Sequence, residues 1–397
     1  MGFVRVTDSG GWKAFWRDPS GAQRSKTFRT KKEATQFLSQ VAVSLSSGAY
    51  VSPHASRTLF GDHARLWMKS WNTERTTAAR DSSIMRNHVL AQWENWQLGK
   101  IDHLSVQTWV SSLSDKRSRA TVAECKRLMS GVMRSAVKNR LIGVDPTVGV
   151  RVPGRRVRDT DERIVTREDV RQRLVPAVQP IRYRTFVATA AFTGLRWGEA
   201  IGLCRDVVDL DWRTARVIRT VTEVAGQTEF KAFPKSRAGV GRFHCRTGWS
   251  MSCGRIWSST HLTGRRGLIF TNAVGGALRR TLFRSRVWRP ALVRAGLLGQ
   301  VREVDGKFEA VWSNELGRTE VENFGKESEA VQHVARNQHG GLRFHDLRHS
   351  YGTWLADDGI VPNKLAKVMG HEDIATTMQL YVRRTEDHDA IRDLLDW

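Results

Sequence analysis

The sequence predicts a multidomain, mainly α protein in which a small β-sheet plus helix module precedes an all-α domain and an α+β domain. Its 397 residues exceed what one hydrophobic core usually serves, so two or three domains are expected. Segments 46–53 and 151–160 are rich in turn-forming or charged residues, and the hydrophobic spacing changes across each. We therefore expect domains at residues 1–52, 58–150 and 161–397.

The first domain is predicted to be a hairpin followed by a helix. Residues 12–30 carry short aromatic and β-branched runs, broken by the turn residues Asp18, Pro19, Ser20 and Gly21. Thr30 and Glu33 then form a capping-box pattern, and apolar residues recur at helical spacing as far as Leu45. A helix should begin directly after Thr30.

The second domain is predicted to be helical throughout. Two apolar stripes at helical spacing support this prediction, and each is expected to face the core. They consist of Leu104, Val106, Trp109, Val110 and Leu113, and of Leu128, Val132, Ala136 and Val137.

The third domain opens with helices. Residues 186–203 fit two helical stretches broken at Thr193 and Gly194, with Arg196 just inside the second stretch. A cation near a helix start opposes the helix macrodipole. Arg196 is therefore either a surface residue of no consequence or a residue that faces an anion.

Strands are expected later in this domain. Residues 214–224 have the composition of a strand and lead into a turn that carries Lys235. Within residues 301–312, Asp305 and Gly306 are flanked by alternating polar and apolar residues, which is a strong hairpin signal.

A helix near residues 345–358 gathers cationic and proton-carrying groups. His345, Arg348 and His349 are three or four positions apart and should share one face, and Gly359 can end the helix. The opposite face is an apolar, core-like set made of Leu347, Tyr351, Trp354 and Leu355. The polar face is either solvated or holds an anion, and a phosphate suits a planar guanidinium well.

The chain is strongly basic, with 64 Lys and Arg against 40 Asp and Glu and a formal net charge of +24. This balance favours a nucleic-acid partner over a small neutral substrate. A membrane surface is the rival partner, but no apolar run approaches the roughly 20 residues that span a bilayer. The first residues also lack the apolar core of a signal peptide. We expect an intracellular protein without a membrane partner.

Neither a disulfide framework nor a metal site is indicated. Four cysteines in so long a chain do not form a disulfide framework. Cys245 and Cys253 lie near His244 and His261, but the C-x-x-C pairing of structural zinc is missing. We therefore expect no metal site.

The basic residues of the first domain are candidates for DNA contacts, because phosphates attract Lys and Arg whatever the base sequence. They are Arg17, Arg24, Lys26 and Arg29. On charge alone, a solvated basic surface fits these residues nearly as well.

Six residues of the third domain together supply the chemical groups for one reaction. They are Arg196, Lys235, His345, Arg348, His371 and Tyr381. A tyrosine nucleophile, two arginines on a phosphodiester, histidines for proton transfer and a lysine acid are the parts needed to cut DNA without a metal. The stretches TGLRWGE, HDLRH, and MGH followed by Tyr381 resemble the motifs of the tyrosine recombinase (phage integrase) family. The resemblance covers the whole chain and is strongest to integrases of actinobacterial temperate phages.

The resemblance implies a role for each residue in metal-free strand cleavage. Arg196 and Arg348 would clamp the non-bridging phosphate oxygens, and Lys235 would protonate the departing 5′ oxygen. Tyr381 would become linked to the 3′ phosphate. The bond energy kept in this link allows strand exchange without ATP, a metal or another cofactor.

The resemblance also implies roles for residues that support this chemistry. His345 would assist proton transfer, and His371 would donate a hydrogen bond to the scissile phosphate. Glu199 stands at an acidic position that helps to order the site in the family.

At the level of the whole protein, the resemblance implies a site-specific recombinase that integrates phage DNA into a host chromosome. It implies an arm-type DNA-binding module, a core-binding (SAM-like) domain and a catalytic domain. Its expected partners are double-stranded attachment sites, on which a homotetramer would act in the cytoplasm of a bacterial host. A directionality factor and a host DNA-bending protein are candidate further partners.

Several segments depart from the family's pattern. Lys235 stands in PKS where the family usually has PKT, and Lys231 lies nearby. Residues 242–266 have no regular period where a strand and a helix are expected, which suggests a locally shifted reading frame or a sequence error. Residues 300–341 form an insertion that we interpret as a surface elaboration. The apolar spacing in residues 388–397 predicts a helix that packs at home or on a neighbouring subunit.

Two other functions stay open. His345 and Asp346 form an HD pair of the kind found in metal-dependent phosphohydrolases, which would require further His and Asp ligands. Alternatively, a catalytically inactive DNA-binding protein could retain the fold. Such a protein would bind DNA in a salt-dependent way but would form no covalent adduct.

Overall fold

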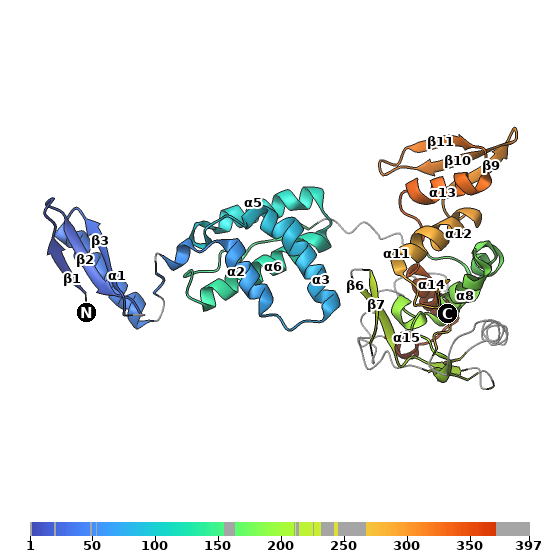
Figure 1. Cartoon of the computed structure of the whole chain (residues 1–397), viewed down its shortest axis with the longest axis horizontal. Helices are drawn as coiled ribbons and strands as arrows, with labels where there is room; N and C mark the ends of the chain where they lie inside the picture. The colour runs from blue at the N-terminus through green and yellow to red at the C-terminus, as the bar shows by residue number, and fades with distance from the viewer. Residues whose placement is uncertain are drawn as a thin grey trace, which may run out of the picture. The chain divides into compact units, whose positions relative to one another are not determined.

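The computed structural model divides into two compact units, Met1–Val157 and Arg158–Trp397, and each is described here by itself (Figure 1). The division falls within the segment 151–160. The finer division of the first unit into two domains stays a prediction. The structure describes residues 2–19, 21–47, 50–52, 54–154, 163–209, 211, 214–224, 226–231, 242–244 (backbone only) and 267–370.

The first unit begins with a three-stranded antiparallel sheet in the order β1-β2-β3, followed by a helix. Its elements are β1 (Phe3–Val6), β2 (Trp12–Arg17), β3 (Gln23–Phe28) and α1 (Lys31–Ser46). The predicted hairpin and helix are confirmed, and Thr30 and Glu33 form the predicted capping box. Strand β1 was not predicted, because only four residues mark it. Trp16 packs against α1 and donates a hydrogen bond from Nε1 to the Tyr50 hydroxyl, 2.8 Å away.

The rest of the first unit is helical, as predicted. Its elements are η1 (Ala55–Arg57), α2 (Phe60–Lys69), α3 (Arg75–Ile84), η2 (Met85–Leu90), α4 (Ala91–Trp93), η3 (Leu98–Lys100), α5 (His103–Lys116) and α6 (Arg119–Lys138). Val106, Trp109 and Val110 are buried on α5, as expected. Leu104 is 74% exposed, so its predicted place in the core is wrong. It lies two positions before Val106, which turns its side chain to the far side of the helix.

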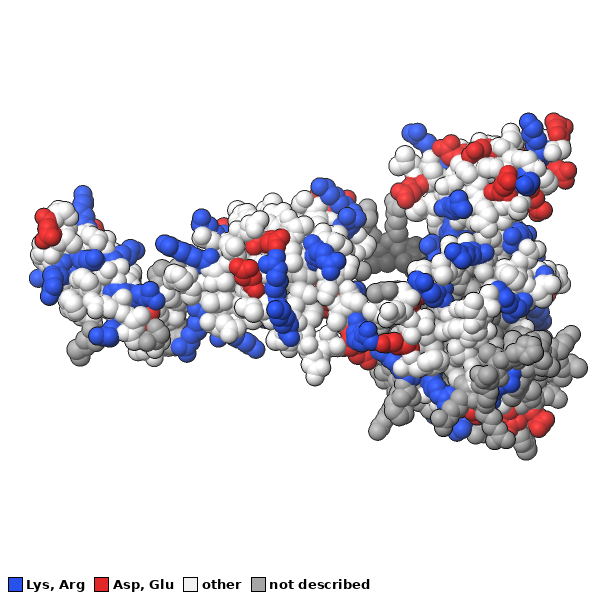
Figure 2. Space-filling view, viewed as in Figure 1, with Lys and Arg blue, Asp and Glu red and all other residues white. Residues whose placement is uncertain are grey.

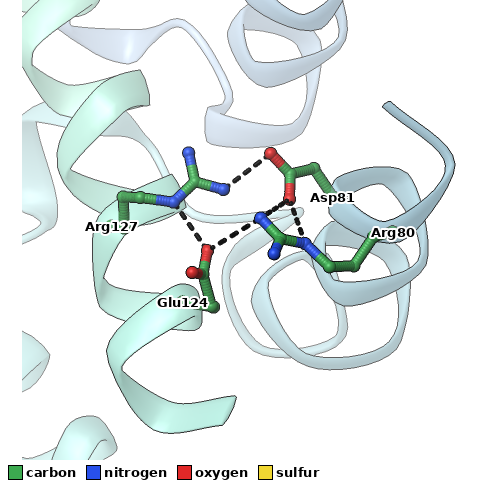
Figure 3. A network of polar contacts seen from close by, with 4 residues as sticks. All are labelled: Arg80, Asp81, Glu124 and Arg127. Atoms are coloured by element: carbon green, nitrogen blue, oxygen red, sulfur yellow. Dashed lines mark hydrogen bonds and ion pairs between the residues drawn. The ribbon is translucent and has the colours of Figure 1, made fainter. Parts of the chain in front are cut away.

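A polar network ties α3 to α6 (Figure 3). The Asp81 carboxylate is only 2% exposed and accepts hydrogen bonds from Arg80, at 3.0 and 3.1 Å, and from Nη2 of Arg127, at 2.6 Å. Glu124 in turn accepts a 2.6 Å hydrogen bond from Nε of Arg127. The buried charge of Asp81 is thus compensated by two guanidiniums, as burial of an ion requires.

The second unit surrounds one large hydrophobic core. Its elements before the insertion are η4 (Asp169–Leu174), α7 (Val175–Ala177), η5 (Ile181–Tyr183), α8 (Arg184–Thr193), α9 (Trp197–Ala200), η6 (Arg205–Val207), β4 (Val208–Asp209), β5 (Thr214–Arg216), β6 (Thr220–Val224), β7 (Gln227–Lys231), β8 (Arg242–His244), α11 (Arg280–Phe283), η8 (Arg284–Trp288) and α12 (Arg289–Arg294). The single strand predicted for residues 214–224 is wrong, because β5 pairs with β4 and β8 whereas β6 pairs with β7. The chain leaves one sheet and enters another between them.

The predicted insertion forms a small lobe of sheet and helix. It contains β9 (Gln300–Val304), β10 (Lys307–Ser313), β11 (Thr319–Phe324) and α13 (Glu327–Asn337). The hairpin at Asp305 and Gly306 is confirmed, and both residues have positive φ, 49° and 71°. Helix α13 lies on one face of the sheet, where Ala310 and Val334 are completely buried (Figure 1). The third strand and the helix were not predicted.

Two helices complete the described part, α14 (Asp346–Asp357) and α15 (Pro362–Met369). Gly359 follows α14 with positive φ, 78°, as the sequence predicts, and Gly370 follows α15 with φ 58°. An aromatic cluster underlies the start of α14. The rings of Phe186, Trp197, Phe283 and Trp288 lie 5.0 to 5.7 Å from the ring of Phe344. This packing fixes the residue just before His345.

Candidate active site

Arg196 lies at the turn between α8 and α9. Gly194 ends α8 with φ 65°, and Arg196 is the N-cap residue of α9, so the prediction that it lies inside the helix is wrong by one position. The anion that it faces belongs to the chain itself. Glu199, 6% exposed, accepts hydrogen bonds from the backbone N–H and from Nη1 of Arg196, both at 2.9 Å. The buried carboxylate offsets the dipole cost of a cation at the helix start and orients the guanidinium.

Arg348 comes from the interior of α14 and is 5% exposed. It donates from Nη1 to the carbonyl oxygen of Gly194 at 2.6 Å, and from Nη2 to that of Met369. Arg196 donates from Nη2 to the next carbonyl oxygen, that of Gly370, at 3.0 Å. Two guanidiniums that are far apart in the sequence therefore meet at the C-terminal end of α15.

This meeting point suits an anion. The backbone carbonyls at a helix C-terminus carry partial negative charge and hold the two arginines in place. A guanidinium has five N–H donors, so the bonds that Arg196 makes to Glu199 and Gly370 leave donors for a further acceptor. The side chain of Arg196 is also 38% exposed, so that acceptor can arrive from solvent.

His345 and His349 lie beside the arginines. His345 is the N-cap residue of α14, and the two imidazole rings are 5.0 Å apart and nearly perpendicular. Burial, followed by the charges of His349 and Arg348, lowers the pKa of His345 to about 4. His345 is also partly exposed to solvent. Its pKa is nevertheless lowered, because His349 and Arg348 both disfavour a further positive charge beside them. His345 is therefore neutral at physiological pH and able to accept a proton.

The carboxylate of Asp346 is bound by Arg343. It is 4% exposed and accepts hydrogen bonds from the backbone N–H of Arg343, at 2.7 Å, and from Nε of Arg343, at 2.9 Å. Within the described ranges, no group of three or more His, Cys, Asp and Glu side chains could hold a metal ion. The further ligands that the HD interpretation requires are thus not found in this part of the chain.

Three predicted site residues, Lys235, His371 and Tyr381, lie outside the described residues. The segment 245–266 and the C-terminal segment 388–397 lie outside them too. Their predicted roles stay predictions.

Sequence reasoning missed Glu223, on β6. Its Oε2 accepts a hydrogen bond from the backbone N–H of Arg280 at 2.8 Å, and its Oε1 accepts one from Nε of Arg279 at 3.3 Å. These bonds tie the β6–β7 hairpin, after which Lys235 follows in the sequence, to the start of α11. The partners are 57 positions apart, and no local pattern could have identified them.

The candidate DNA-contact residues of the first unit differ in their surroundings. Arg24 donates to Asp18 at 2.8 Å, and Lys26 lies over the rings of Phe28 and Phe37, at 5.3 and 5.0 Å. Both are therefore engaged within the module itself. Arg29 is exposed.

Arg17 belongs to the sheet face that points away from α1. It donates to the carbonyl oxygen of Gly21 at 2.9 Å and shares its face with Lys13 and Phe15 by strand alternation. Arg5 pairs with Lys13 across β1 and β2 and extends this basic face. The sequence analysis missed Arg5 and Lys13, although the alternation in residues 12–17 signalled their side of the strand.

The part of the chain that contains α14 and α15 is similar to a known protein family. Residues 317–388 match the phage integrase family. Over these residues the chain is thus similar to the family that its sequence motifs resemble. A protein of Mycobacterium tuberculosis, named as the integrase of prophage phiRv2, is 29% identical over 250 residues, which cover 60% of the chain and 64% of that relative. The match thus spans somewhat less than two thirds of the mycobacterial protein.

Other similar proteins align over longer spans. A tyrosine recombinase XerC-like protein of Caldanaerobacter subterraneus is 21% identical over 95% of the chain and 94% of its own length. The Tn1549 transposon integrase, solved with circular intermediate DNA, has a TM-score of 0.61 over 85% of the chain and 99% of its own, at 16% identity. A lambda integrase dimer bound to a core site has a TM-score of 0.54 over 97% and 95%, at 14% identity. These structural likenesses show that the fold is that of integrases, as predicted.

No helix among the described residues is long and apolar enough to cross a membrane.

Proposed function

We propose that the chain is a site-specific DNA integrase that cuts and rejoins DNA through a 3′-phosphotyrosine intermediate. The observation that supports this most strongly is the meeting of Arg196 and Arg348 at the residues just before His371. A phosphodiester that replaces solvent beside these guanidiniums receives charge-assisted hydrogen bonds to its non-bridging oxygens. The same bonds strengthen as negative charge grows in the pentavalent transition state, which lowers the barrier.

The neutral state of His345 fits a role in proton transfer. A tyrosine has a pKa near 10, so roughly one in a thousand is ionised at neutral pH, and it must lose its proton as it attacks. An imidazole with a pKa of about 4 is free of its proton at that pH and can accept one. Lys235 would then protonate the 5′ oxygen that leaves, so that proton loss and proton gain balance.

Tyr381 is the proposed nucleophile among the four tyrosines of the chain. Tyr50 and Tyr183 are buried at 7% and 8% exposure, and Tyr50 accepts a hydrogen bond from Trp16. Burial raises the pKa of Tyr351, which packs against Gly194. Burial thus keeps Tyr50 and Tyr183 from reaching a phosphate, and the raised pKa of Tyr351 makes that residue less able to ionise.

At the level of the organism, the proposal is integration of phage DNA into a bacterial chromosome in the host cytoplasm. The mycobacterial relative is named as a prophage integrase, and a lambda integrase tetramer on a Holliday junction shares the fold with a TM-score of 0.53. The first supports integration, and the second supports a homotetramer, which we propose acts on two attachment sites. The basic sheet face with Arg5, Lys13 and Arg17 would bind arm-type DNA. A directionality factor and a host DNA-bending protein are proposed as further partners.

A covalent-trapping assay tests the proposed function. The protein first selects its binding sequence from a random DNA library, and this sequence is then presented as a nicked duplex in EDTA. We expect an SDS-stable adduct of protein and DNA with the native chain and none with Tyr381→Phe. DNA binding without any adduct would contradict the proposal and favour a catalytically inactive DNA-binding protein. An adduct with both proteins would contradict the choice of nucleophile.

A further inference from the structure

A continuous helical segment of the second unit is unusually rich in arginine. Six arginines and no acidic residue occur from Arg279 to Arg294, along α11, η8 and α12. In Figure 2, basic side chains predominate over the part of this unit where Figure 1 places α11 and α12, whereas acidic side chains gather on the β9–β11 lobe. The charge of this unit is therefore not evenly distributed.

The buried member of this segment is Arg289, which is 8% exposed. Its guanidinium donates to three carbonyl oxygens, those of Ala335, Gln338 (2.5 Å) and Gly340 (2.8 Å). All three of its side-chain nitrogens are thus engaged by the turn after α13. Arg289 holds the backbone that leads to His345, and it has little capacity left for a ligand.

Arg284 stands above Arg289 on the same side of the segment. The helix changes here to a π turn, in which the backbone N–H of Arg289 donates to the carbonyl oxygen of Arg284. Residues five apart are neighbours in such a turn, and π turns are frequent at functional sites. The side chain of Arg284 is exposed.

Arg163, near the start of the second unit, lies close to the turn after α13 that contains Gly340. A Cβ atom on Gly340 would lie 2.7 Å from Nη2 of Arg163, so this guanidinium lies directly over Gly340, whose carbonyl oxygen binds Arg289. Burial, then the charges of Arg284 and Arg163, lower the pKa of Arg289. Among the residues that the structure describes, neither Arg163 nor Arg284 has an ion pair with a carboxylate.

Three guanidiniums around one glycine turn repel one another, and an anion would offset that repulsion. Arg163 and Arg284 are exposed and offer planar, multiple donors, the geometry that phosphate oxygens favour. The backbone of Arg284 is held in a packed helical segment, and two residues after Arg163 the backbone N–H of Val165 donates to the Ser350 hydroxyl, 3.1 Å away, so little order would be lost on binding.

We propose that Arg163 and Arg284, held around the buried Arg289, form a second anion site that takes a backbone phosphate of duplex DNA outside the scissile phosphodiester. The inference rests on the proposed function, because it assigns a further contact to the same substrate. Gly340, at the centre of this site, is five residues before His345 along the chain. Leu342 lies between the two in the sequence, and its carbonyl oxygen accepts a hydrogen bond from Nε1 of Trp288, 2.8 Å away. Binding there would hold the DNA near the candidate active site without taking part in the chemistry.

Salt dependence of DNA binding tests this site. Each phosphate contact adds roughly 0.9 to the slope of log affinity against log salt concentration. Fluorescence anisotropy of the full-length protein on a short labelled duplex, from about 50 to about 200 mM salt, should give a slope that is shallower by about 0.9 in the double variant Arg163→Gln, Arg284→Gln, because one phosphate contact is lost. The matched control is Arg318→Gln, an exposed arginine in the turn between β10 and β11, which should keep the native slope.

Two further results decide the interpretation. The double variant Arg163→Lys, Arg284→Lys keeps both charges and should therefore have most of the native slope. A slope in this lysine variant as shallow as in the glutamine variant would mean that the substitutions affect folding rather than charge. That result would overturn the site. A glutamine variant with the native slope would overturn the site and leave the proposed function intact. Failure of the native protein to bind the duplex at all would contradict the proposed function together with this inference.

Discussion

A single methyl group at Gly194 would disturb the geometry of the candidate active site. The Gly194→Ala variant must adopt φ 65°, and its Cβ atom would lie 2.4 Å from Cδ1 of Tyr351. The left-handed conformation costs about 1–2 kcal/mol and the overpacking about 1–3 kcal/mol, so we expect the free energy of unfolding to fall by roughly 2–5 kcal/mol. Because the Gly194 carbonyl accepts Nη1 of Arg348, the guanidinium should shift as well.

Gly359→Ala is the matched control for this prediction. Gly359 also follows a helix with positive φ, 78°, but a Cβ atom there would meet nothing within 4 Å. Urea unfolding should give a loss of only about 1–2 kcal/mol for the control, and adduct formation should stay near the native rate. Adduct formation by Gly194→Ala should fall at least roughly tenfold, about 1.4 kcal/mol in the barrier. Equal stability losses in both variants would refute the clash with Tyr351, and a native adduct rate in Gly194→Ala would refute the coupling to Arg348.

Three further predictions concern charged groups. In the variant Glu199→Gln, Arg196 loses its charged partner. The single-turnover rate of adduct formation should therefore fall roughly tenfold, whereas DNA affinity should change little. A change in affinity alone would contradict this role of Glu199. The folded state keeps His345 neutral down to about pH 4, whereas the unfolded chain protonates it near pH 6.5, so stability should fall as the pH drops through this window. Urea unfolding at both ends of the window should show a smaller loss for His345→Gln, and an equal loss would argue against the lowered pKa. Asp81→Ala should lower the free energy of unfolding by about 1–3 kcal/mol, because the network between α3 and α6 loses its buried acceptor. Glu124→Ala, at 32% side-chain exposure, should cost less, and the reverse order would contradict the role of burial.

Features that depend on neighbouring residues could be predicted from the sequence. The capping box at Thr30, the hairpin at Asp305 and Gly306, and the helix end at Gly359 each follow from the conformational preference of one or two residues. The same local reasoning failed at residues 214–224, where one apolar run supplies two strands to different sheets. Sheet membership depends on distant partners, which the run itself does not reveal.

The sequence indicated which residues belong to the candidate site but not which contacts they make. The family motifs singled out Arg196 and Arg348, yet their shared position at the end of α15 depends on a fold that brings together residues 174 positions apart. The engagement of Asp346 by Arg343 was equally hidden, because the motif does not show which group its carboxylate binds. Long-range packing, rather than local preference, decides where the two arginines meet.

The central claim is a covalent phosphotyrosine link at Tyr381, and mass spectrometry of the trapped adduct tests it most directly. Digestion of the adduct formed in EDTA should yield one nucleotide-modified peptide, and we predict that it contains Tyr381. Modification of Tyr351 or of a serine or histidine side chain would contradict the assigned chemistry. So would the absence of any modified peptide from a protein that binds its selected DNA.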